Sequence, residues 1–188
     1  MCGIAGLISG GQVDDALVRS MASRITHRGP DGAGVWIDPE AGVGLGHRRL
    51  AIVDLSPAGH QPMVSSDGRW VLNFNGEIYN HEAIRSALNE GGRGPAANGT
   101  AWRGHSDTET LVECIAALGL DRTLEQAVGM FAFALWDRRE RKLHLVRDRF
   151  GEKPLYYGWA GGDFVFASEL KALQGLKRFD NAIDRRAV

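Results

Sequence analysis

The stretch MCGIAGLISG, residues 1–10, places one of only two cysteines directly after the initiator methionine and follows it with a small, apolar run. Removal of Met1 would leave Cys2 with a thiol and a free α-amino group on one residue. An unperturbed thiol has a pKa of about 8.5 and an α-amine one of about 7.7–8.0, so the amine can act as the base that activates the thiol. The run Gly3–Ser9 predicts a buried strand directly behind this candidate nucleophile. A cysteine at position 2 is also compatible with chance, and the rest of the chain has to decide between the two.

Length and composition bound the class of protein. With 188 residues, 44% hydrophobic and 24% charged, the chain fits one domain with a packed core. Its formal net charge of −1 gives no indication of a nucleic-acid partner. Cys2 and Cys114 form neither a metal-ligand spacing nor a disulfide framework, so no metal is expected. Without a signal peptide or an apolar run of about 18 residues, the chain is predicted to be cytoplasmic with no membrane partner.

Strands and helices alternate along the chain in a pattern typical of an α+β layered domain. The glycine-rich segment 91–104 has no periodicity and predicts an exposed loop or insertion. Short links between strands favour antiparallel pairing. Cys114 falls on the apolar face of a helix and is interpreted as a core residue. Apolar periodicity predicts helices over about 14–25, 81–89 and 107–118, and strands over 3–9, 35–37, 43–47, 70–75, 130–137, 142–148, 154–160 and 164–168.

Four stretches combine charge with glycine: HRGPDG (27–32), GHRRLAIVD (46–54), NFNGEIYNH (73–81) and GHSDTET (104–110). In the third, Asn75 and Gly76 offer a side-chain amide and a backbone N–H, two donors that suit a developing oxyanion. Asn-Gly after a strand is also the strongest short hairpin signal, and taken alone it favours a turn.

Charged residues in the other stretches suit an amino-acid ligand. Arg48 and Arg49 lie in an apolar run, and strand alternation would turn one of them inward, where a guanidinium needs an anion such as a carboxylate. The alternative is a charge that protects a sheet edge. Asp107 is most simply a helix N-cap, as Ser106 also could be, or it could hold an amino group. Together with Cys2 and the Asn75 amide, these groups are what cleavage of a side-chain amide by a thiol requires.

Six motifs in order carry a family resemblance: MCGIAG, THRGPDG, HRRLAIVD, NGEIYNH, GMFAFALWD and RDRFGEKPLYY. From Met1 to about Leu173 the chain resembles the class II glutamine amidotransferase domain of glutamine-hydrolysing asparagine synthetases. The resemblance implies an N-terminal-nucleophile hydrolase, a four-layer αββα sandwich of two antiparallel sheets. It also implies glutaminase chemistry through a glutamyl thioester, with ammonia passed to a C-terminal ATP-dependent synthetase domain. Residues 1–175 would form the amidotransferase domain, and 176–188 would begin the linker to the synthetase domain.

The resemblance also implies a role for each site residue. Cys2 would be the nucleophile, and Arg28 would lie near it. Asn75 and Gly76 would form the oxyanion hole. The remaining residues would bind L-glutamine. Arg49 would pair with its α-carboxylate, and the backbone of Leu50, Ile52 and Val53 would line the pocket on the carboxylate side. Glu77 and Asp107 would bind its α-amino group.

Cofactors are expected only outside this chain. ATP and Mg belong to the synthetase domain that the resemblance implies, where an SGGxDS loop binds phosphate. The stretch SGGQVDD (9–15) is similar to that loop, but Val13 stands at its fifth position, so we interpret it as a turn that leads into the first helix.

Three alternatives stay open. A retained Met1 would leave Cys2 without a free amine, and the chain would then be a non-catalytic module. A glucosamine-phosphate or phosphoribosylamine synthase is another class II relative, although NGEIYNH combined with RRLAIVD favours the asparagine synthetase type. A homodimer is an option that the sequence does not decide.

Overall fold

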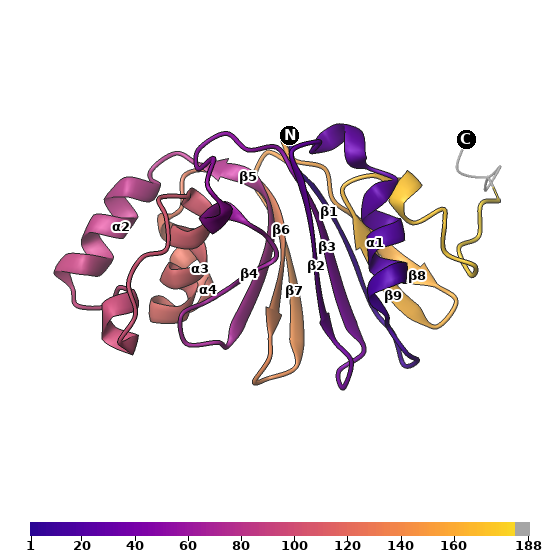
Figure 1. The fold of residues 1–188 in the computed structure, drawn as a ribbon, viewed down its shortest axis with the longest axis horizontal. Coiled ribbons are helices and arrows are strands. Elements are labelled where there is room, and N and C mark those ends of the chain that lie inside the picture. The colour runs from indigo at the N-terminus through magenta and orange to yellow at the C-terminus, as the bar shows by residue number, and fades with distance from the viewer. Residues whose placement is uncertain (183–188) are drawn as a thin grey trace.

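Residues 1–182 of the computed structural model form two antiparallel sheets packed face to face, with helices on both outer faces (Figure 1). The first sheet has the order β2-β3-β1-β9-β8, and the second has the order β4-β5-β6-β7. The expected four-layer αββα sandwich is therefore confirmed. The strands of the first sheet are β1 (Gly3–Ile8), β2 (Gly32–Asp38), β3 (Val43–Arg49), β8 (Tyr156–Ala160) and β9 (Asp163–Ala167). Those of the second are β4 (Met63–Val64), β5 (Trp70–Ile78), β6 (Gly129–Asp137) and β7 (Lys142–Arg147).

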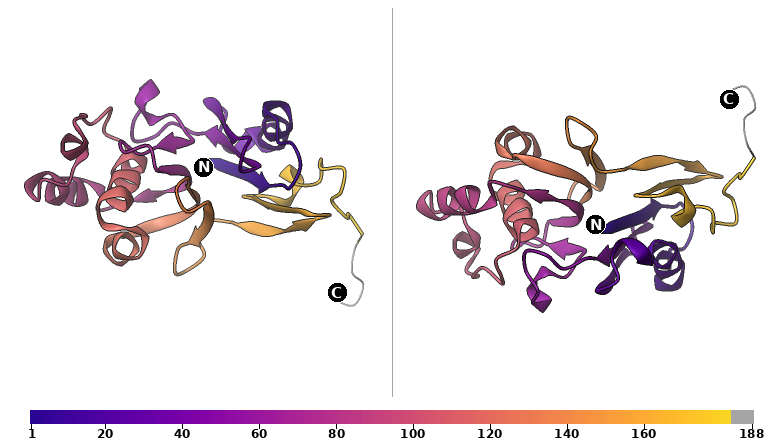
Figure 2. Two further views of the ribbon diagram at one scale, coloured as in Figure 1. Left: turned by 90° about the horizontal axis from the view of Figure 1, so that it is seen from below. Right: turned by 90° about the horizontal axis from the view of Figure 1, so that it is seen from above.

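Helices cover the two outer faces unequally. Helix α1 (Asp15–Ser23) packs on the first sheet, and α3 (Asp107–Leu118) packs on β5 of the second. Helices α2 (His81–Glu90) and α4 (Leu120–Gln126) lie against α3. Both views of Figure 2 place the N-terminus near the middle of the molecule, between the two sheets. The first residues of the chain therefore lie where the two halves of the sandwich meet.

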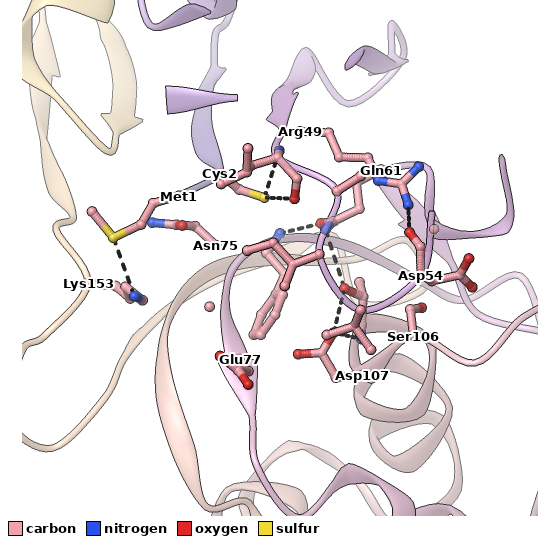
Figure 3. A pocket seen from close by; sticks show the side chains of 18 of the residues that line it. Met1, Cys2, Arg49, Asp54, Gln61, Asn75, Glu77, Ser106, Asp107 and Lys153 are labelled. Atoms are coloured by element: carbon pink, nitrogen blue, oxygen red, sulfur yellow. Dashed lines mark hydrogen bonds between the residues drawn. The ribbon is translucent and has the colours of Figure 1, made fainter. Parts of the chain in front are cut away.

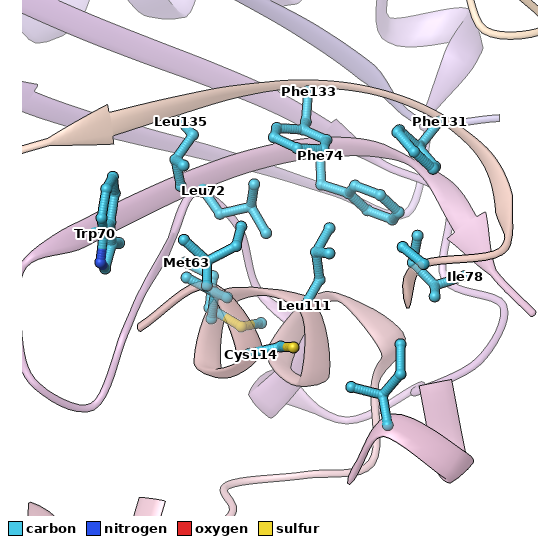
Figure 4. Close-up of a cluster of buried hydrophobic side chains, with 14 of the residues drawn as sticks. Met63, Trp70, Leu72, Phe74, Ile78, Leu111, Cys114, Phe131, Phe133 and Leu135 are labelled. Carbon is cyan, nitrogen blue, oxygen red and sulfur yellow. The ribbon is translucent and has the colours of Figure 1, made fainter. Parts of the chain in front are cut away.

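Three apolar clusters fill the spaces between the layers. The cluster between the sheets is built around Ile4, Leu45, Val71, Trp136 and Phe166. A second cluster lies under α1, and a third joins the second sheet to α2 and α3 (Figure 4). Cys114 is fully buried in this third cluster, as predicted.

Local capping explains where the first helix begins. The Asp14 side chain accepts a hydrogen bond from Leu17 N at 2.7 Å, which pairs one of the free N–H groups of the first turn. Ser9 Oγ accepts from Gly11 N at 3.0 Å, so SGG is a compact turn between β1 and α1. This confirms the interpretation of SGGQVDD as a turn. The helix ends at Ser23, two residues earlier than expected, and is followed by a short 3₁₀ turn over Thr26–Arg28.

The turn favoured locally at Asn75–Gly76 is absent, because β5 continues through both residues to Ile78. Asn75 pairs with Ala132 and Gly76 with Phe131 across the ladder to β6. A Cβ on Gly76 would collide with the carbonyl of Met130, so glycine serves close strand approach here rather than a reversal of the chain. Long-range strand pairing has overridden a local turn preference.

Other elements differ from expectation in detail. Helix α4 was not predicted; it is short and follows directly on Gly119, whose φ of 86° ends α3. The segment 91–104 is largely exposed, as predicted, and it contains a 3₁₀ turn (Pro95–Asn98) that was not predicted and in which Pro95 is buried. Two more 3₁₀ turns, Pro57–Gly59 and Leu170–Ala172, and the short strand β4 were also not predicted.

The last part of the predicted linker, residues 183–188, lies outside the described residues, and the domain boundary at 175 stays a prediction. Within residues 1–182, no helix is long and apolar enough to cross a membrane.

Candidate active site

A pocket lies at the end of the sandwich where β1 begins (Figure 3). Strands β3 and β5, the loop after β3 and the first turn of α3 all contribute to its wall. It brings together every site residue in the sequence prediction: Cys2, Arg49, Leu50, Ile52, Val53, Asn75, Gly76, Glu77 and Asp107. Arg28 lies just behind the wall.

The Cys2 thiol is half-buried between two backbone groups of Leu50. Leu50 N donates to the sulfur at 3.4 Å, and the thiol donates to Leu50 O at 3.6 Å. Burial raises the pKa of the Cys2 thiol, against a smaller lowering effect of the Leu50 hydrogen bond. The thiolate is therefore scarce at neutral pH, and a nucleophilic role for Cys2 requires a nearby base.

Arg28 fixes the backbone of the nucleophile. Its Nε donates to Cys2 O at 2.9 Å, and its Nη1 lies 3.1 Å from Glu169 Oε1. The Arg28 side chain is 9% exposed and that of Glu169 is 27% exposed, so this ion pair is partly shielded from water. Glu169 also accepts from His27 at 2.9 Å. Arg28 thus reaches Cys2 through its carbonyl and not through its sulfur.

Asn75 is fully buried, yet neither atom of its side-chain amide has a hydrogen-bond partner among the described residues. Buried amides are almost always paired, so an exception calls for an explanation. Asn75 lines the same pocket as Cys2 (Figure 3). An unpaired amide next to a thiol suits a charge that appears only during a reaction.

Arg49 points into the pocket, whereas Arg48 donates to Gly29 O at 3.2 Å. The two arginines therefore separate as strand alternation predicts. Arg49 Nη1 donates to Ser56 O at 3.0 Å, and Nη2 donates to Asp54 O. Two backbone carbonyls thus orient a guanidinium that keeps further N–H groups for a carboxylate.

Asp107 is not the N-cap of α3. Ser106 takes that place, and its Oγ accepts from Glu109 N at 3.1 Å. The Asp107 carboxylate instead accepts from Ile78 N at 3.0 Å and Thr108 N at 2.8 Å. Burial raises the pKa of Asp107, and the two backbone N–H groups oppose that rise. A buried carboxylate in this position would be stabilised by an ammonium ligand.

Several residues of the pocket carry no signal that was used to predict them from the sequence. Gln61 Oε1 accepts from Phe74 N at 2.7 Å, and its Nε2 donates to Thr108 Oγ1 at 3.4 Å, which ties β5 to α3 beside Asn75. No motif pointed to Gln61. Lys153 also lines the pocket and lies in RDRFGEKPLYY, a motif that could have suggested it.

Met1 also lines the pocket, with its sulfur 3.4 Å from Lys153 Nζ. While Met1 is attached, the nitrogen of Cys2 is an amide and has no basic lone pair. The described residues contain no group of three or more His, Cys, Asp or Glu side chains placed to hold a metal ion. The chemistry that this pocket supports is attack by a thiol on an acyl group of an amino acid.

The fold is that of a known class of amidotransferases. The chain superimposes on glutamine phosphoribosylpyrophosphate amidotransferase from B. subtilis with a TM-score of 0.74, at 24% identity over 92% of this chain and 43% of that one. Identity at this level supports the fold alone. The sandwich, with a cysteine at the head of its first strand, is an N-terminal-nucleophile hydrolase fold.

The family follows from the sequence comparison. A family model described as a glutamine amidotransferase domain matches residues 1–188, and the chain belongs to this family. It is 36% identical over 178 residues to asparagine synthetase [glutamine-hydrolyzing] 2 of Bacillus subtilis, covering 92% of this chain and 22% of that protein. It is 35% identical over 193 residues to asparagine synthetase [glutamine-hydrolyzing] 1 of the same organism, covering 100% and 29%. It is 35% identical over 185 residues to amidase chry2 of Gibberella zeae, covering 92% and 26%. The chain thus spans less than a third of the length of these relatives.

Proposed function

We propose that this domain hydrolyses the side-chain amide of L-glutamine with Cys2 as its nucleophile. The observation that carries the proposal is the buried amide of Asn75, which has no hydrogen-bond partner among the described residues and lines the same pocket as the Cys2 thiol, Arg49 and Asp107. Arg49 binds the α-carboxylate of glutamine, alongside the backbone of Leu50, Ile52 and Val53. Asp107 and Glu77 take the α-ammonium group.

The first half of the reaction forms a thioester. Once Met1 is removed, the α-amine of Cys2 takes the thiol proton, and the sulfur attacks the amide carbon of glutamine. The negative charge that develops on the amide oxygen is stabilised by the Asn75 side chain and the Gly76 N–H. When the tetrahedral adduct collapses, the carbon–nitrogen bond breaks and the Cys2 ammonium returns the proton to the leaving ammonia.

The second half releases glutamate. The α-amine takes a proton from a water molecule as the water oxygen attacks the thioester carbon. The carbon–sulfur bond then breaks and the thiol is regenerated. Because burial raises the pKa of the Cys2 thiol, the amine is needed as the base at neutral pH.

The partner is an ATP-dependent synthetase domain, as in glutamine-hydrolysing asparagine synthetases, and it receives the ammonia. Identity of 35–36% to two proteins of that name supports this assignment. ATP and Mg act in that domain, and this domain uses no cofactor. We place the protein in the cytoplasm, where its two unpaired cysteines would stay reduced. Assembly as a homodimer stays a prediction.

The test compares Cys2→Ala with Cys114→Ala, which changes the buried cysteine on α3. Cys2→Ala should release no glutamate from glutamine, and Cys114→Ala should keep the activity. Hydroxylamine should divert the wild-type thioester to the γ-glutamyl hydroxamate. Glutamate release by Cys2→Ala at the normal rate would overturn the proposal.

A second candidate function is a non-catalytic glutamine-binding module, and the observation that favours it is the place of Met1 in the pocket wall. Mass spectrometry of the purified protein separates the two. A protein that has lost Met1 and hydrolyses glutamine is the enzyme, whereas a protein that keeps Met1 and only binds glutamine is the module.

A further inference from the structure

The loop from Leu50 to Ser56, which we call the substrate loop, has little apolar contact to hold it in place. It follows β3 and contains no helix or strand. Ile52 is 68% exposed and Leu55 is 77% exposed. Its firm points are polar ones, because Arg49 donates to the carbonyls of Asp54 and Ser56.

Asp54 is the buried residue of this loop and is only 3% exposed. It accepts from Ser56 N at 2.8 Å within the loop and from His105 N at 3.1 Å across the pocket rim. Burial would raise the pKa of Asp54, but these hydrogen bonds lower it to about 2, so the group is a carboxylate at any working pH. Asp54 therefore joins the substrate loop to the segment before α3.

The His105 side chain contacts the same loop at a second point. Its Nε2 lies 3.1 Å from Val53 O, and its Nδ1 lies 3.6 Å from Asp54 Oδ2. Gly104 makes room for this contact, since a Cβ there would collide with the Asp54 carboxylate. One histidine thus bridges a backbone carbonyl and a carboxylate of the loop that is proposed to bind glutamine.

The segment that carries His105 is itself anchored. Arg103 N and Gly104 N donate to the two oxygens of Glu109 at 2.7 and 3.1 Å. Arg85 of α2 donates to Gly104 O at 2.7 Å, and its guanidinium stacks 3.9 Å above the ring of Trp102. The end of the 91–104 segment is therefore well anchored where His105 contacts the substrate loop.

We propose that His105 is a positioning residue that holds the substrate loop in its glutamine-binding shape. The imidazole Nε2 of His105 hydrogen-bonds to Val53 O, and its backbone N–H donates to the Asp54 carboxylate, so this one residue holds two consecutive residues of the loop. The inference rests on the proposed function, since it concerns glutamine binding to the same pocket.

The expected result is a change in glutamine affinity without a change in turnover. His105→Phe keeps a ring but removes both nitrogens, and it should raise the KM for glutamine about tenfold, with kcat within twofold. His105→Gln restores one donor and should recover part of the loss. The matched control is His144→Phe on β7, which retains a ring against Trp70 outside the pocket.

Direct binding keeps this test separate from that of the proposed function. Calorimetric titration of Cys2→Ala with glutamine measures affinity without hydrolysis, and adding His105→Phe to it should weaken that affinity about tenfold. Equal affinities would overturn the role of His105 and leave the proposed function intact. No binding to Cys2→Ala alone would overturn the proposed function, and the role of His105 with it. A fall in kcat and in the thermal midpoint of His105→Phe would show a purely structural role.

Discussion

The two walls of the pocket are built in opposite ways. The wall that faces the reacting amide consists of strands, with Cys2 at the head of β1 and Asn75 inside β5. Asn75 is fully buried there, and its amide has no hydrogen-bond partner within residues 1–182. The wall that faces the amino-acid end consists of Arg49 at the end of β3, Glu77 near the end of β5, the substrate loop and the first turn of α3. There Arg49, Asp54 and Asp107 all have hydrogen-bond partners within the protein.

This difference separates the two tasks of the site. A group that stabilises a transition state is most effective when it is fixed in place and unpaired beforehand, since no protein hydrogen bond has to break during the reaction. A group that recognises a substrate only has to be oriented, and hydrogen bonds to backbone carbonyls can orient it. Changes on the strand wall should therefore lower kcat, and changes on the loop wall should raise KM.

The largest effect should come from Asn75→Ala. Loss of one oxyanion donor lowers kcat by about 10²–10³ while KM changes little. Steady-state glutamate release measures both constants. Asn98→Ala, at the exposed tip of the 91–104 segment, is the matched control. A near-normal kcat in Asn75→Ala would remove Asn75 from the oxyanion hole.

Arg49→Ala should come next, with a KM for glutamine raised about 100-fold and a much smaller change in kcat. The glutamine α-carboxylate would then enter the pocket without its ionic partner, which is worth several kcal/mol when the pair is shielded. Arg48→Ala is the control, because the Arg48 side chain is next to Arg49 in the sequence but donates to Gly29 O and does not line the pocket. If Arg48→Ala raised KM and Arg49→Ala did not, the two arginines would exchange roles.

Asp107→Asn should raise KM about tenfold and also stabilise the fold at neutral pH. Burial raises the pKa of Asp107 in the folded protein above its value in the unfolded chain. The ionised carboxylate therefore lowers the free energy of unfolding at a pH above the folded pKa, and this cost disappears as the pH falls below the unfolded pKa. Asparagine can keep the hydrogen bond from Ile78 N without the charge. Urea unfolding at pH 7 tests the sign, with the exposed Asp121→Asn as control. A less stable Asp107→Asn would show that the hydrogen bonds outweigh burial.

The smallest effect on catalysis should come from His47, which braces the strand wall between the sheets. His47 Nδ1 lies 2.9 Å from Asn73 Oδ1, two residues before Asn75, and burial lowers the pKa of His47 to about 4. The unfolded chain binds a proton below pH 6.5 and the folded chain only near pH 4. As the pH is lowered from 6.5 to about 4, the free energy of unfolding should therefore fall by about 3 kcal/mol. His47→Gln should lose this part of the pH dependence and keep its kcat at pH 7.5, whereas His144→Gln should retain the slope.

The sequence predicted the fold and the pocket lining because six motifs span both walls. It also predicted strand and helix types where periodicity extends over a whole element, as in α3 and β6. It failed at Asn75–Gly76, where local turn chemistry competes with a nine-residue strand pairing that only the folded chain contains. It failed at α4, a short helix that follows Gly119 and has only two apolar residues, Leu120 and Leu124, which is too few for a periodic pattern.

Side-chain contacts between distant segments were beyond the sequence for a different reason. Gln61 acts through Phe74 and Thr108, and His105 acts through Val53 and Asp54. Neither residue has a spacing that signals its partner, because each depends on loops that meet only in three dimensions. Of the two N-cap candidates that the sequence offered, Ser106 is the cap and Asp107 is not, which leaves the Asp107 carboxylate free for the pocket.

The unpaired Asn75 amide has a consequence for the evolutionary history of such domains. A buried amide without partners costs about 1–3 kcal/mol that an apolar side chain of similar size would not. Selection for stability alone therefore pushes this position towards leucine, and only selection for catalysis holds it as asparagine. A descendant that has lost its chemistry should drift here first, so the identity of this one residue would mark which descendants still work.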